Sequence, residues 1–299
     1  MTNKRIGDKR SAINEVWLSL RNRGPDEFTH LSHADFYFFH SRLAVVDAKS
    51  KSIQPLTHGD YIGLLNGELY NYDALRREME ARGYFFTSNN DSELLLYLYE
   101  SLGEDMFERL EGEYSFVIYN KKTEDIIAAV DPFGIKPLYY LQEGDLISIG
   151  SRKSTVLLTV PAKKRRIDHK AASHAATYGY LPTGKTLIEG LCKLGPGEIL
   201  TIKDGRRKKR RYYDLMSLLN ERSIAELEEK AESELNAESK DIGIDETYSL
   251  DRIKNLLMDA VRRRIPSSDQ HMAVHLSGGL DSSIVSGILA LMAPSDATN

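Results

Sequence analysis

The string best suited to chemistry is Ser277-Gly278-Gly279-Leu280-Asp281-Ser282-Ser283, near the end of the 299-residue chain. Glycines allow a tight turn, and the N–H groups at the start of a following helix attract anions. The serine hydroxyls add hydrogen-bond donors for phosphate oxygens. A bare phosphate would repel Asp281, so the carboxylate implies Mg²⁺ between them. The spacing favours a phosphate loop over a plain serine-capped turn, and it lacks the Gly-Lys-Ser/Thr ending of a Walker A loop.

A strand before this loop and a helix after it are expected to hold the loop in place. The apolar residues 273–276 predict a short strand before it, and residues 282–291 predict a helix after it. A second helix is predicted over residues 250–265, where apolar residues recur at helical spacing.

The first two thirds of the chain alternate between short strands and helices. Helical spacing predicts helices over residues 11–20, 73–82 and 91–102, with Asn90 as the cap of the third. Strands are predicted over residues 36–46, 61–65, 114–119, 126–130, 138–140, 146–150 and 198–203. Closely spaced strands with short turns, flanked by helices, predict an α+β layered domain with antiparallel sheets.

Eight strings in this part occur in the order of one family. They are Arg23-Gly24-Pro25-Asp26, His40-Ser41-Arg42-Leu43, Gln54-Pro55-Leu56, Asn66-Gly67-Glu68-Leu69-Tyr70-Asn71, Asn90-Asp91-Ser92-Glu93, Asp131-Pro132-Phe133-Gly134-Ile135-Lys136-Pro137-Leu138-Tyr139-Tyr140, Gly179-Tyr180-Leu181-Pro182-Thr183 and Lys193-Leu194-Gly195-Pro196-Gly197. The loop at Ser277 is similar to that of ATP pyrophosphatases. Together these strings resemble glutamine-hydrolysing asparagine synthetase from about Ala12 to Met292.

The resemblance implies a fold and a domain organisation. The expected fold is the N-terminal-nucleophile four-layer αββα sandwich of class II glutamine amidotransferases, followed by the first βα unit of an α/β pyrophosphate-loop (ATP pyrophosphatase) domain. The expected boundaries are an amidotransferase domain over residues 1–214, a charged linker or helix over 215–249, and the start of the ATP-binding domain over 250–299.

The resemblance also implies residue roles. Arg42 would hold the carboxylate of glutamine, Asp91 with Glu68 its ammonium, and Asn66 with the backbone of Gly67 the oxyanion formed during hydrolysis. The residues implied for ATP are Leu276, Ser277, Gly278, Gly279, Asp281, Ser282 and Ser283, with Mg²⁺ on Asp281. Taken singly, Arg42 could instead be a surface ion-pair residue, and Asn66-Gly67 a hairpin turn.

Some positions depart from the family pattern. The family nucleophile is an N-terminal cysteine, whereas this chain opens Met1-Thr2 and its one cysteine, Cys192, is expected to pack in the core. The segment before Arg23 is also short by about one strand, which should weaken a central sheet. Val130 replaces an arginine, and Arg152 reverses the charge of a glutamate. We therefore expect a chain truncated at both ends and inactive as given, with Thr2 a weaker candidate nucleophile.

The implied activity is ATP-dependent amidation of aspartate with ammonia from glutamine, in asparagine biosynthesis. The alternatives are a β-lactam-synthetase-like cyclase and a non-catalytic glutamine-binding paralogue. The net charge of −4, the single cysteine and the lack of a long apolar segment predict a cytoplasmic protein without nucleic-acid or membrane partners. A homodimer is compatible with the resemblance. The basic run from Arg206 to Arg211 is expected to be a solvated strand edge.

Overall fold

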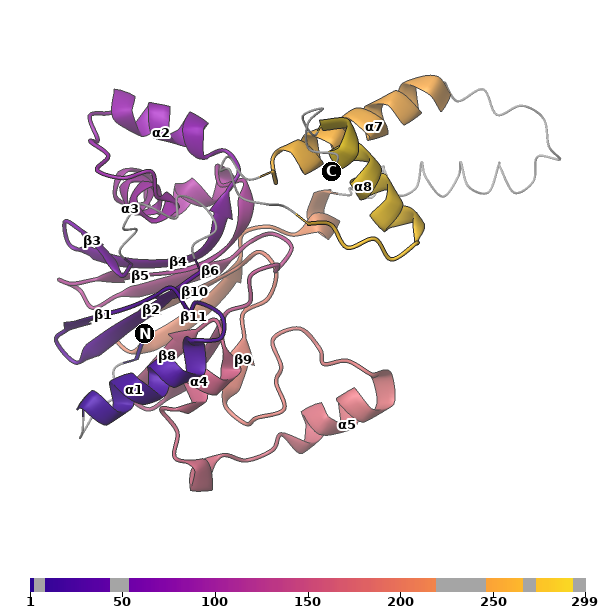
Figure 1. Ribbon diagram of the computed structural model, residues 1–299. Helices are drawn as coiled ribbons and strands as arrows, with labels where there is room; N and C mark the ends of the chain where they lie inside the picture. The colour runs from indigo at the N-terminus through magenta and orange to yellow at the C-terminus, as the bar shows by residue number, and fades with distance from the viewer. Residues whose placement is uncertain (3–8, 44–53, 219–245, 266–272, 293–299) are drawn as a thin grey trace. The chain divides into compact units, whose positions relative to one another are not determined.

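The computed structural model describes residues 1–2, 9–43, 54–218, 246–265 and 273–292 (Figure 1). The chain divides into two compact units. One runs from Met1 to Asp214 apart from residues 45–47, and the other continues from Leu215.

The first unit is built on a six-stranded antiparallel sheet. Its strands, in spatial order, are β11 (Arg206–Arg211), β10 (Glu198–Lys203), β6 (Ile126–Val130), β5 (Gly112–Asn120), β4 (Tyr61–Leu69) and β3 (Leu56–His58). All five residues of β6, an inner strand, are buried, so side chains cover both faces of the sheet. The basic strand β11 lies at one edge with all six residues exposed, which confirms the prediction for this run.

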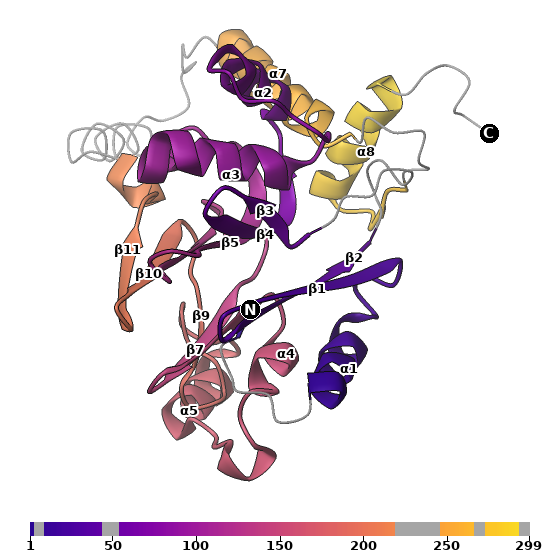
Figure 2. The same cartoon turned by 90° about the vertical axis from the view of Figure 1, so that its left-hand side faces the viewer.

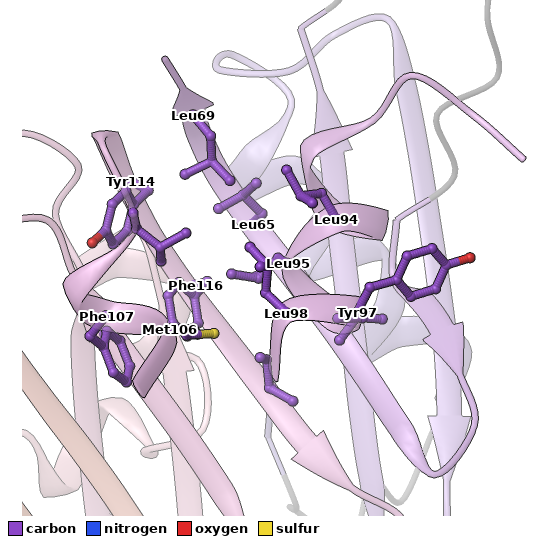
Figure 3. Close-up of a cluster of buried hydrophobic side chains, with 14 of the residues drawn as sticks. Leu65, Leu69, Leu94, Leu95, Tyr97, Leu98, Met106, Phe107, Tyr114 and Phe116 are labelled. Carbon is purple, nitrogen blue, oxygen red and sulfur yellow. The ribbon is translucent and has the colours of Figure 1, made fainter. Parts of the chain in front are cut away.

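Two helices cover one face of this sheet, α2 (Tyr72–Ala81) and α3 (Asp91–Leu102) (Figure 2). A 3₁₀ turn, η1 (Gly103–Glu108), follows α3. Leu94, Leu95 and Leu98 of α3 pack with Leu65 of β4 and Phe116 of β5 in one buried cluster (Figure 3). This packing holds α3 in position on the sheet, and with it Asp91, the first residue of the helix.

A second sheet faces the other side of the first. It contains the hairpin β1 (Glu27–His33) with β2 (Phe36–Arg42), and the three strands β8 (Leu146–Gly150), β7 (Tyr139–Glu143) and β9 (Leu191–Lys193). Met1 and Thr2 connect the two groups. Thr2 N–H donates to Tyr37 O (3.0 Å) and Tyr37 N–H to Thr2 O (2.7 Å), while Met1 N donates to Ile149 O and Ile149 N–H to Met1 O, both at 2.9 Å.

The fourth layer consists of α1 (Lys9–Leu20) and α4 (Lys153–Leu157), which lie against the second sheet. Between the two sheets is a core that includes Phe38 from β2, Ile149 from β8, Ile62 from β4 and Val117 from β5. The order helices, sheet, sheet, helices confirms the predicted four-layer αββα sandwich (Figure 1).

Several elements differ from the sequence-based expectation. Strand β4 runs on to Leu69 instead of ending at Leu65, and β2 ends at Arg42, with residues 44–46 of the predicted strand outside the described residues. Sequence patterns did not identify β1, β9 or the helix α5 (His169–Tyr178). The polar β1 and the exposed α5 lack the apolar alternation on which such predictions depend.

The second unit contains α7 (Glu246–Arg262) and α8 (Leu280–Met292). The predicted strand over residues 273–276 is wrong, because these residues form no strand in the structure. A strand needs a hydrogen-bonded neighbour, and the described residues of this unit provide none. Large apolar side chains of both helices, such as Leu256 and Leu291, are exposed. Within the described residues, no helix combines the length and apolar character needed to cross a membrane.

Candidate functional site

Strand β4 places Asn66, Gly67 and Glu68 at one end of the sandwich. Alternation along β4 puts Ile62, Asn66 and Glu68 on the face that looks toward the second sheet, where Ile62 joins the core between the sheets. The pair Asn66-Gly67 is thus part of a strand, and the hairpin-turn alternative is wrong.

Gly67 is required where β4 and β5 approach each other. It has φ of 140°, and a Cβ atom there would lie 2.0 Å from the carbonyl oxygen of Glu113. No side chain fits at that distance, so the residue must be glycine for β4 to continue to Leu69.

The carboxamide of Asn66 carries an unpaired donor. Its Nδ2 atom is shielded from solvent and has no hydrogen-bond partner in the described structure. Asn66 lies directly opposite Ser115 in the β4–β5 ladder, and the Oγ of Ser115 is also buried and unpaired. Buried polar groups are nearly always hydrogen-bonded, so the amide of Asn66 and the hydroxyl of Ser115 can each take a further polar partner.

Asp91 is brought to the end of β4 by α3. Asn90 caps this helix, as predicted, since its side chain accepts from the N–H of Ser92 (2.9 Å). Asp91 Oδ2 then accepts from the N–H of Leu69 at 3.0 Å, which fixes the carboxylate beside Glu68. Burial and the charge of Glu68 raise the pKa of Asp91 to about 7, although the hydrogen bond from Leu69 opposes this.

Glu68 has a perturbed pKa for related reasons. Desolvation and the charge of Glu113 raise the pKa of Glu68, and the charge of Lys136 counteracts them in part. Glu113 lies opposite Glu68 in the ladder, 3.4 Å from Lys136 Nζ, and it accepts from the hydroxyl of Tyr70 (2.9 Å). Negative charge therefore exceeds positive charge around Glu68 and Asp91.

The loop that delivers Lys136 is organised by Asp131. This buried carboxylate accepts from the backbone N–H groups of Phe133 (3.0 Å), Ile135 (3.1 Å) and Lys136 (3.0 Å). The family strings in the sequence include the one that starts at Asp131, but they indicate no role for Lys136, Glu113 or Ser115. Glu113 and Ser115 lie at the site because of the β4–β5 register, and Lys136 because of the loop that Asp131 holds; a single sequence reveals neither.

Arg42 lies at the end of β2, on the second sheet. Its side chain is only 12% exposed, so it is not a surface residue, and Nη1 is 3.9 Å from Glu27 Oε2. His40, two residues earlier on the same face, has its pKa lowered to about 4 by burial and by the charge of Arg42.

Gln54 links the strand pair of Arg42 to β4. Its backbone oxygen accepts from Thr29 Oγ1, and its side-chain Oε1 accepts from the N–H of Leu65 at 2.6 Å. Thr29 is the cross-strand partner of His40. At the other end of β2, Phe36 and Phe38 pack on Tyr119, which lies opposite Ile62. Strands β2 and β4 thus advance in the same direction, and Arg42 and Glu68 lie toward the same end of the sandwich.

The departures from the family pattern have different surroundings. Val130 is fully buried in the core between the sheets and pairs with Ser115 in the β5–β6 ladder. Arg152 is half-buried at the start of α4. Cys192 lies in β9 opposite Tyr140, partly buried against the core between the sheets, in agreement with the packing role predicted for it.

The serine-rich loop belongs to the second unit. Gly278 has φ of 82°, Ser277 Oγ lies 3.0 Å from Ser282 Oγ, and the hydroxyls of Ser282 and Ser283 donate to Gly279 O at 3.1 and 2.8 Å. The loop leads into α8, and most of its side chains, with Leu276, are exposed. Its hydroxyls and the helix start fit a phosphate group. No cluster of three or more metal-ligating side chains occurs within the described residues, Asp281 included.

Comparison with known proteins gives two family matches. The family described as "Glutamine amidotransferase domain" matches residues 2–213, and the family described as "Asparagine synthase" matches residues 252–298. The order of the two matches agrees with the predicted resemblance.

Among curated proteins, the chain is similar to asparagine synthetase [glutamine-hydrolyzing] 1 and 3 of Bacillus subtilis. The identities are 30% and 32%, covering 96% of this chain and 42% and 44% of those proteins. It is 28% identical to amidase chry2 of Gibberella zeae, over 95% of this chain and 40% of that protein. The chain thus spans less than half the length of these relatives.

Among solved structures, the chain is similar to glutamine phosphoribosylpyrophosphate amidotransferase from B. subtilis. The identity is 22% and the TM-score 0.41, over 58% of this chain and 34% of that one. A likeness at this level has no bearing on the function.

Proposed function

The chain belongs to the glutamine amidotransferase domain family, and from that premise we propose that its first unit binds free L-glutamine between the ends of β2 and β4. The observation that carries the proposal is the unpaired, buried Nδ2 of Asn66 beside the carboxylates of Glu68 and Asp91. The amide donor suits the side-chain carbonyl of glutamine, and the carboxylates suit its ammonium.

Each charged group of glutamine has a complement in this arrangement. Burial, and after it the negative charge nearby, raises the pKa values of Glu68 and Asp91, and an ammonium between them would stabilise their charged forms. Arg42 supplies a guanidinium for the carboxylate in a bidentate geometry. Asn66 and the backbone of Gly67 supply donors to the oxygen of the amide as it becomes an oxyanion.

We further propose that the chain serves the ATP-dependent amidation of aspartate; its Bacillus relatives are named glutamine-hydrolysing asparagine synthetases. The loop residues from Leu276 to Ser283 would hold ATP, with Mg²⁺ bound between its phosphates and Asp281.

The same proposal includes the division of the chain into domains. The amidotransferase domain would be residues 1–214, a linker residues 215–249, and the start of the ATP-binding domain residues 250–299. A cytoplasmic location, a homodimer and the lack of nucleic-acid or membrane partners belong to the same proposal.

Isothermal titration calorimetry with L-glutamine tests the glutamine site. We expect binding that Asp91→Asn and Arg42→Ala each weaken by about 10-fold or more, because each removes a charge-assisted contact. Glu80→Gln is the matched control, since Glu80 forms an exposed ion pair with Arg76 on α2. Lack of binding by the unsubstituted chain would contradict the proposal and favour the cyclase alternative.

The proton balance of binding gives a second, independent readout. An ammonium beside Asp91 lowers the pKa of this carboxyl from about 7, so binding near pH 6.5 should release a proton. Titrations in two buffers that differ in ionisation enthalpy measure this release. Asp91→Asn should abolish it.

A further inference from the structure

Glu68 has a second carboxylate directly across the sheet. Glu113 lies opposite it in the β4–β5 ladder, so both side chains are on the same face, and Cβ atoms of such pairs are about 4.5–5.5 Å apart. Like charges in this arrangement repel each other. The glutamine site as described uses Glu68 and Asp91 but gives Glu113 no function, so the third carboxylate requires an explanation.

Lys136 compensates the charge of Glu113. Its Nζ atom is 3.4 Å from Oε2 of Glu113, and the hydroxyl of Tyr70 donates to Oε1 at 2.9 Å. The side chains of Lys136 and Glu113 are only 31% and 28% exposed, so solvent screens the pair in part. Lys136 is held at this place through its backbone, because its N–H donates to Asp131 Oδ2 at 3.0 Å. A substitution of its side chain therefore leaves this anchor intact.

The two charges of this pair act on Glu68 in opposite directions. Burial raises the pKa of Glu68 and the charge of Glu113 raises it further, whereas the charge of Lys136 lowers it. Further charged or titratable groups beside the site are Asp91 on α3, Arg42 and His40 on β2, and Tyr70 after β4. Because the pair is neutral as a whole, its two charges largely cancel at Glu68.

We propose that Lys136 is a positioning residue, which offsets the charge of Glu113 and so keeps the carboxylate of Glu68 in the ionised form that binds the ammonium of the ligand. This inference rests on the proposed glutamine site and adds the residue that determines its pH range. Without Lys136, Glu68 takes up a proton at a higher pH and must release it before an ammonium binds. Without the charge of Glu113, the opposite holds.

The test measures how much the Kd for L-glutamine rises in the full chain when the pH is lowered from 8 to 5.5. Lys136→Met should increase this rise about 3- to 10-fold relative to the unsubstituted chain, as a pKa increase of about 0.5 to 1 at Glu68 requires. Glu113→Gln should decrease the rise, and because the direction is opposite, this variant tests the inference on its own. The double variant again places no net charge beside Glu68 and should restore the rise of the unsubstituted chain.

Lys122→Met is the matched control. Lys122 follows β5 and forms an exposed ion pair with Asp60, at 2.7 Å, so its loss should leave the pH dependence of binding unchanged. A change in Kd by the same factor at both pH values in Lys136→Met would indicate a merely structural role and overturn the inference alone. A double variant as pH-dependent as Lys136→Met would also overturn it. If the unsubstituted chain bound no glutamine, the proposed function would fall and this inference with it.

Discussion

Asp91 and Glu93 lie two residues apart in the first turn of α3 and have opposite pKa shifts. Burial alone would raise the pKa of Glu93, but hydrogen bonds from Ser88, Thr87 and Tyr97 lower it overall. The stability that Glu93 contributes is therefore present above its unfolded pKa and lost as the pH falls. Asp91 has the reverse effect, since its folded pKa of about 7 exceeds its unfolded value and stability decreases as the pH rises between them.

Asp91→Asn should remove this decrease. We expect the variant to gain stability relative to the unsubstituted protein as the pH rises from 5 to 8, by roughly 2–4 kcal/mol over the range. Melting temperatures in the absence of glutamine measure the effect. Asp73→Asn, at the exposed first turn of α2, is the control for losing a carboxylate at a helix start. A difference that does not change with pH would contradict the raised pKa.

At the residue scale, motif order predicted Arg42, Asn66, Gly67, Glu68 and Asp91 as a set. The structure brings Glu68 and Asp91 together and puts Asn66 and Gly67 beside them. Glu113 and Ser115 could not be predicted, because their place at the site depends on which residue of β5 lies opposite which residue of β4. The glutamine-binding roles remain predictions until ligand binding is measured.

At the element scale, the loop before α3 depends on Glu93. Its buried carboxylate accepts from the N–H groups of Thr87 (2.8 Å) and Ser88 (2.9 Å), from both their hydroxyls and from Tyr97. Glu93→Gln replaces one carboxylate oxygen, which accepts these hydrogen bonds, by an NH₂ group that can only donate and would face other donors. We expect a loss of about 2–4 kcal/mol in urea unfolding, against less than about 0.5 kcal/mol for the exposed Glu80→Gln. Equal losses would show that these hydrogen bonds contribute little.

The end of β4 provides a second prediction at this scale. Gly67→Ala would force a Cβ atom against Glu113 O and an alanine into a positive φ, so we expect a loss of about 2–4 kcal/mol in unfolding free energy. Gly83→Ala is the control, because Gly83 also has positive φ but open space around its Cβ position. There we expect about 1 kcal/mol. Similar losses of unfolding free energy for Gly67→Ala and Gly83→Ala would mean that a small shift of β5 away from β4 makes room for the Cβ atom.

Elements with clear apolar periodicity were predictable from sequence, and elements held by their neighbours were not. α3 and β6 have such patterns and were found where expected. β1 has few apolar residues and exists because it pairs with β2 along its whole length. Residues 273–276 show the opposite case: their apolar pattern predicts a strand, but no strand forms because no partner strand is present in the described residues.

At the scale of the whole molecule, the proposed domain boundary near residue 214 can be tested by limited proteolysis. Residues 215–249 are rich in charged residues and poor in large apolar ones, and such segments are preferred cleavage sites. We expect an early product close to residues 1–214, identified by intact mass, that binds glutamine with the same affinity as the full chain. Early cleavage inside the αββα sandwich, or loss of binding on release, would contradict this division.

The dipeptide Met1-Thr2, which links the two parts of the second sheet, should control the hydrogen exchange of two distant backbone amides. Met1 and Thr2 connect β2 to β8 through four backbone hydrogen bonds, two of which come from the N–H groups of Tyr37 and Ile149. These two residues are far apart in the sequence, yet both amides are protected by the same dipeptide. A local opening of that dipeptide would expose both at once. Tyr37 and Ile149 should therefore have a common protection factor against exchange with deuterium, lower than those of the interior amides of β5.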